Sequence, residues 1–226
     1  TDTSNTVDEQ KVKVLWERME AAANTGGFVG ACSNANKLMQ LVPDDFRPMF
    51  YKGKGAMRNN MNIKAYQDWI EMIPHLDGKA LAEVYDPMID ETVDAMIRKV
   101  GDFPWSEQML DSIRRIDREI KVKWPASNYY RDFVERMIDR FPLTYTAEKD
   151  VFYASEVTRF AALLFPTMFL DEMSALAVKV RDYNSHMFGS YKAGNAPRGE
   201  FKKTGLVNGY ANYTNYIATE ADRLFR

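Results

Sequence analysis

The sequence predicts an all-α protein, an irregular multi-helix bundle of about seven to nine helices. In segment after segment, apolar side chains recur three and four residues apart, whereas the period-two alternation of a half-buried strand is nearly absent. Proline or glycine stands at the ends of these segments, where helices end. We expect a helical core over residues 11–188, in one bilobed unit, between an N-terminal arm (1–10) and a Gly/Tyr-rich C-terminal arm (189–226).

Five amphipathic helices are predicted before residue 142. Thr6 and Glu9 form a capping-box pattern ahead of an apolar stripe that ends at Gly26 and Gly27. Asn62 can cap a second helix that ends before Pro74, because proline breaks the backbone ladder. The other three are expected from Asp86-Pro87 to Gly101, over Ser106 to Val122, and over Ser127 to Phe141.

Beyond residue 146 the pattern predicts two more helices and then an irregular segment. Apolar residues continue at helical spacing from Ala147 to His186, with a break or kink expected at Pro166. Five glycines then predict a long loop or arm, followed by a short terminal helix that carries Tyr213 and Leu224.

Composition excludes several classes of protein. Cys32 is the only cysteine, so neither an intramolecular disulfide framework nor a cysteine-based zinc cluster is possible within one chain. The longest uncharged apolar run, Phe160 to Leu170, is too short to span a bilayer, and we expect no membrane partner. The polar, acidic beginning of the chain is unlike a secretory signal, so the expected location is cytoplasm or virion.

Signatures of catalysis are missing, and we expect no enzyme, cofactor or metal site. The sequence has neither the Gly-x-Ser-x-Gly elbow nor the phosphate loop, since Lys52 to Gly55 has the right residues at the wrong spacing. Carboxylates stand four residues before both histidines, His75 and His186, but Pro74 interrupts the first of these pairs. An enzyme with a site built from scattered residues, around one of these histidines, stays as an alternative that ranks below the two hypotheses given at the end of this section.

Positive charge is concentrated in two segments, although the net charge of the 226-residue chain is −2. Between Arg47 and Lys64 there are five basic residues and no acidic one. Between Gly189 and Gly205 there are four basic residues and one glutamate. Glycines and aromatic residues are interleaved with both sets. Because cations neutralise phosphates and aromatic faces stack on bases, we expect nucleic-acid contacts from Arg47, Tyr51, Lys52, Lys54, Arg58, Lys64, Tyr191, Arg198, Lys202 and Lys203.

These observations lead to a functional hypothesis and an alternative. The first is a self-assembling structural protein, of the viral coat or nucleocapsid type, that binds RNA or single-stranded nucleic acid without strong sequence preference. Its partners would be the nucleic acid and further copies of itself, in a homo-oligomer or filament. The alternative is a helical protein–protein interaction or regulatory module without nucleic acid. A purely structural interpretation is that both basic segments are solvated loops that aromatic residues anchor to the core.

Overall fold

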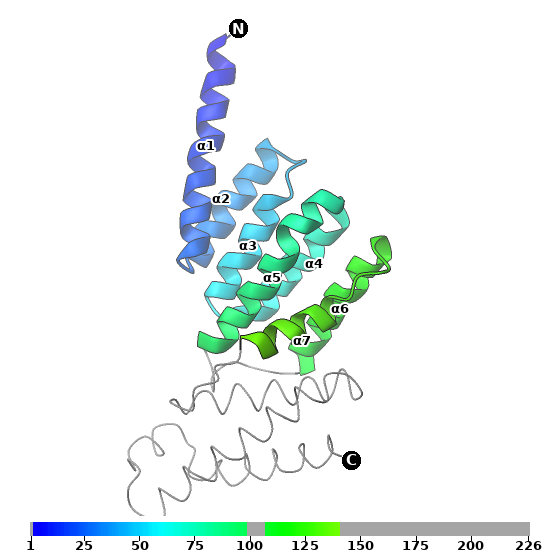
Figure 1. The fold of residues 1–226 in the computed structure, drawn as a ribbon. Coiled ribbons are helices and arrows are strands. Elements are labelled where there is room, and N and C mark those ends of the chain that lie inside the picture. The colour runs from blue at the N-terminus through cyan, green and yellow to red at the C-terminus, as the bar shows by residue number, and fades with distance from the viewer. Residues whose placement is uncertain (1, 99–106, 141–226) are drawn as a thin grey trace, which may run out of the picture. The chain divides into compact units, whose positions relative to one another are not determined.

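The computed structural model describes residues 2–98 and 107–140, and these residues are helical almost throughout. They form seven α-helices and one 3-10 helix with no strand, which confirms the predicted all-α class. The elements in chain order, coloured along the chain in Figure 1, are α1 (Asp2–Asn24), α2 (Phe28–Leu41), α3 (Arg47–Arg58), α4 (Asn62–Met72), η1 (Ile73–His75), α5 (Gly78–Arg98), α6 (Glu107–Lys123) and α7 (Tyr129–Asp139).

The chain divides into two compact units. The first comprises Thr1–Ala95 and Phe103–Asp132, and the second Met96–Asp102 and Phe133–Arg226. The candidate sites described below lie in the first unit. The helices predicted over 147–186 and the C-terminal arm lie outside the described residues.

A tight turn makes α1 and α2 antiparallel neighbours. Gly26 adopts a φ of +75°, which favours glycine, and the N–H of Gly27 bonds to the carbonyl of Ala22 at 2.8 Å. Leu15 and Met19 of α1 then pack against Ala35 and Leu38 of α2 to form a buried cluster. Figure 1 shows α1 lying beside α2 and continuing past its end.

Three predictions for this half of the chain need correction. Residues 2–10, predicted as an arm, belong to α1, whose helix begins at Asp2. No helix was expected over Phe28–Leu41, because α2 buries mainly small residues at the helical spacing of Ala31, Ala35 and Leu38. The basic segment is a helix over Arg47–Arg58 and not a loop.

The glycines that suggested a loop in this segment are packing positions of α3. A Cβ on Gly53 would lie 2.0 Å from Nε1 of Trp69, so only glycine lets α4 come this close. The fully buried Trp69 indole donates a hydrogen bond of 3.1 Å to the carbonyl of Phe50 and stacks on the Phe50 ring at 6.2 Å between centroids. Glycine here allows close helix contact.

Helix α5 begins eight residues before the predicted start at Asp86. Asp77 precedes it and accepts the N–H of Ala80 at 2.8 Å, which is the hydrogen bond of an N-terminal cap. Pro87, predicted at the first helical position, lies inside the helix. The buried hydroxyl of Tyr66 on α4 donates to Thr92 of α5 at 2.8 Å and joins these two helices.

Candidate functional site

Helix α3 carries four of the predicted site residues on one face. Arg47, Tyr51, Lys54 and Arg58 follow one another at intervals of four, three and four residues, so their side chains leave the helix in similar directions. The structure therefore brings these four together. Their neighbours, however, include carboxylates from elsewhere in the chain.

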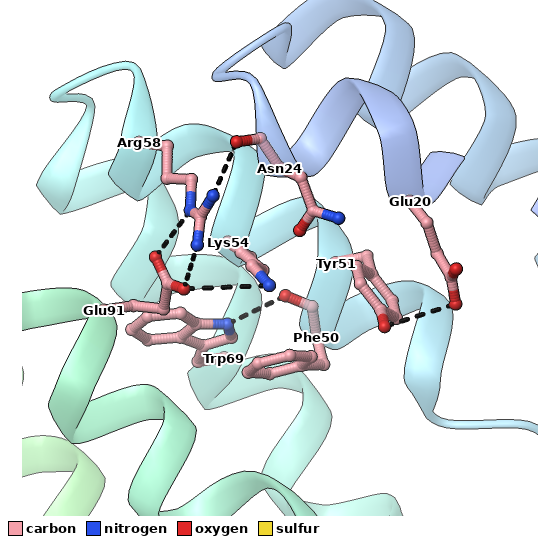
Figure 2. A network of polar contacts seen from close by, with 8 residues as sticks. All are labelled: Glu20, Asn24, Phe50, Tyr51, Lys54, Arg58, Trp69 and Glu91. Atoms are coloured by element: carbon pink, nitrogen blue, oxygen red, sulfur yellow. Dashed lines mark hydrogen bonds and ion pairs between the residues drawn. The ribbon is translucent and has the colours of Figure 1, made fainter. Parts of the chain in front are cut away.

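Arg58 and Lys54 converge on the buried carboxylate of Glu91 in α5. The Arg58 guanidinium donates from two nitrogens to the two Glu91 oxygens, both at 2.9 Å, and Lys54 Nζ lies 3.7 Å from Oε1 (Figure 2). A third Arg58 nitrogen donates to the carbonyl of Asn24 at the end of α1 at 2.5 Å. Arg58 thus ties α1, α3 and α5 together, and the pairing with Glu91 raises its pKa.

Arg47 is also held within the chain. Its guanidinium pairs with Asp45 at 2.5 Å and lies 4.8 Å from the centre of the Trp16 ring. Burial raises the pKa of the Asp45 carboxyl, but the hydrogen bonds and charge of Arg47 outweigh burial and leave this pKa below its ordinary value. This pair fixes the loop that precedes α3.

Lys64 pairs with Asp68 one turn further along α4, at 2.6 Å, and the Asp68 side chain is almost completely buried. Lys52 is half-buried and forms no ion pair with another described residue. Three carboxylates therefore neutralise three of the five cations between Arg47 and Lys64. A local charge of +5 in the sequence becomes a surplus of about +2 in the fold.

Tyr51 is half-buried and does not present a free ring. Its hydroxyl donates to Glu20 of α1 at 3.3 Å, and its ring packs edge-on against Trp16 and Phe50. Burial, followed by the nearby charge of Glu20, raises its pKa. The second predicted set, Tyr191, Arg198, Lys202 and Lys203, lies outside the described residues.

The most distinctive surface that the sequence analysis missed is a groove between α1 and α2, here called the α1–α2 groove. Its volume is about 710 Å³, and its lining contains four aliphatic, two amide and three basic side chains and no acidic one: Val7, Gln10, Lys11, Val14, Leu15, Arg18, Lys37, Gln40 and Leu41. None of the three cations forms an ion pair with another described residue. Val7 and Leu41 are 65% and 41% exposed.

The sequence contained a signal for this groove. Val7 and Val14 are seven residues apart, and so are Lys11 and Arg18, so the four share one face of a helix. Assigning residues 1–10 to an arm hid the repeat, because Val7 then had no helix to belong to.

A second depression, of about 890 Å³, lies where the α2–α3 loop meets the start of α5. Its charged lining mixes acids and bases, and two of its carboxylates already have structural roles, Asp45 with Arg47 and Asp77 at the start of α5. His75 is exposed at its edge. Within residues 2–98 and 107–140, no three His, Cys, Asp or Glu residues are grouped closely enough to hold a metal ion.

Comparisons with protein-family models, with curated proteins and with solved structures find no match for this chain. Among the helices in the described part, none combines the length and the apolar character needed to cross a membrane.

Proposed function

We propose that this chain is a non-enzymatic structural protein that acts by binding another protein chain, with the α1–α2 groove as its contact surface. The groove itself carries the proposal. It combines exposed aliphatic side chains with cations that have no internal carboxylate partner, in a concave surface between two helices. Concave apolar grooves between helices are a recurrent binding mode for partner segments.

Two properties of the groove support binding over a purely solvated surface. Val7 and Leu41 leave apolar area in contact with water, and covering it contributes roughly 25 cal/mol per Å². The three cations add attraction for a partner of opposite charge and orient it. By contrast, the cations of α3 are mostly paired within the chain, which favours a structural role for that segment.

Site-specific photo-crosslinking tests the proposal. A crosslinking amino acid at Leu41 should capture a defined protein in cells that make the chain, whereas the same group at Val29, which is 77% exposed and does not line the groove, should not. Lys37→Glu should weaken capture from position 41. Equal capture from both positions, or none from either, would contradict the proposal.

Nucleic-acid binding with self-assembly is the second candidate. One observation favours it: Glu91 is shared by two cations and Lys52 has no described carboxylate partner, so α3 keeps a positive surplus. If this surplus neutralises phosphates, Lys52→Gln should reduce the salt dependence of RNA affinity by about one unit of slope, while Lys13→Gln on the exposed side of α1 should not. An unchanged slope in Lys52→Gln, measured with short single-stranded RNA, would remove this role for α3.

A further inference from the structure

We infer that the α1–α2 groove binds an acidic amphipathic helix supplied by a different protein chain. The inference rests on the proposed function and specifies the chemistry of the partner. It follows from the shape of the groove, its apolar floor and the sign of its charges.

The apolar part of the groove has the dimensions of a short helix contact. Val7 and Val14 lie two turns apart on α1, Leu15 lies beside Val14, and Leu41 faces them from α2. From Val7 to Arg18 the groove extends on the order of 17 Å, which matches about three turns of a partner helix. Such a helix would place apolar side chains at positions i, i+3 or i+4, and i+7 along this floor.

The positive charges on the rim of the groove favour a negatively charged partner. Lys11, Arg18 and Lys37 are exposed, whereas the remaining polar lining residues are the uncharged Gln10 and Gln40. Lys11 and Arg18 are also one heptad apart. A partner helix with glutamates or aspartates on both sides of its apolar stripe therefore meets cations along its length and no repulsive carboxylate.

The same features favour a protein helix over two other polyanions. A nucleic acid would satisfy the cations but has few apolar groups to cover Val7 and Leu41. An anionic bilayer is entered by side chains that protrude, whereas these apolar residues line a concave surface.

The described surface of a second copy does not supply the complement. The other large apolar side chains exposed in the described part are Val29, Met61 and Val122. No carboxylate stands within four positions of Val29 or Met61. Around Val122 the only carboxylate within four positions is Glu119, against the three cations Arg118, Lys121 and Lys123. None of these three exposed apolar sites therefore offers the acidic, apolar helix face that would complement the basic groove.

The test uses the full chain and three labelled helical peptides of about 18 residues that share one leucine stripe. Their flanking positions carry glutamate, glutamine or lysine. In fluorescence anisotropy the glutamate peptide should bind most tightly, and its Kd should rise about tenfold or more in the variant K11E/R18E/K37E, since three exposed pairs are lost. The lysine peptide should bind this variant better than the parent chain, which also shows that the variant is folded. Lys13→Glu, outside the groove, should change neither affinity.

Each alternative occupant has its own outcome. Glutamate and lysine peptides of equal affinity, or no binding of any peptide, overturn the inference. Tighter binding to single-stranded RNA or to vesicles with anionic lipid, lost in the same triple variant, overturns it in favour of those ligands. Growth in particle size with concentration that Leu41→Glu abolishes assigns the groove to a second copy. If peptides fail while Leu41 still crosslinks one protein, the partner chemistry is wrong and the proposed function stands; if both fail, the proposed function is also wrong.

Discussion

Glu91→Gln should destabilise the first unit by about 2 to 3 kcal/mol, because it leaves two cations facing a neutral amide. Removing one partner of a buried ion pair costs about 3 to 5 kcal/mol. The Glu91 side chain is 9% exposed, but those of Lys54 and Arg58 are 18% and 30% exposed, so solvent reduces the loss. Glutamine keeps the size of the side chain and one oxygen acceptor for Arg58, so the change isolates the charge.

Urea denaturation followed by tryptophan fluorescence measures this loss, since the buried Trp69 belongs to the same unit. In a chain of this size the corresponding fall in Tm is about 5 to 10 °C. Asp111→Asn is the matched control: Asp111 pairs with Arg114 at 3.3 Å but is 69% exposed, and its loss should stay under about 0.5 kcal/mol. Equal effects of the two changes would refute the assignment of Glu91 as a structural anchor.

Two further predictions concern packing and pH. Gly53→Ala should lower the free energy of unfolding by about 2 to 4 kcal/mol despite the helix propensity of alanine, because the added Cβ would lie 2.0 Å from Trp69. Gly78→Ala is the control. Its added Cβ would lie 3.8 Å from the nearest atom, so this change should be nearly neutral in the same urea titration. Burial raises the pKa of Tyr66, so the contribution of this group to stability is complete below its unfolded pKa of about 10 and is lost as pH rises further. Absorbance at about 295 nm should therefore show no Tyr66 ionisation near pH 10 in the native chain, by difference from Tyr66→Phe; a normal step there would show that the side chain is not buried.

Large apolar residues at helical spacing made three of the described helices predictable. The stripes around Trp69, Ile113 and Phe133 correctly placed α4, α6 and α7, because each buries large side chains that stand out against polar neighbours. Helix α2 escaped prediction because alanines carry its buried face, and α3 because its glycines also occur in loops. Proline at position 87 suggested a helix start, although the cap at Asp77 lies ten residues earlier.

The candidate site was harder to predict, because charge counting does not show which charges meet. Two partners lay just outside the segment that was counted: Asp45 precedes Arg47, and Asp68 follows Lys64 by one turn. The third, Glu91, lies 33 residues from Arg58, a separation that only the packing of α5 on α3 removes. Local sequence carries no information on such a pairing, whereas the seven-residue repeat on α1 was visible.

The position of Glu91 also matters during synthesis. The chain emerges N-terminus first at about 5 to 20 residues per second, so the carboxylate follows Arg58 by about 2 to 7 s. During that interval α1 to α4 can already associate through short-range apolar contacts, while the guanidinium and the Lys54 ammonium still lack their anion. Until α5 has been synthesised, the partly folded chain therefore carries two cations on α3 without the carboxylate that they share in the finished fold.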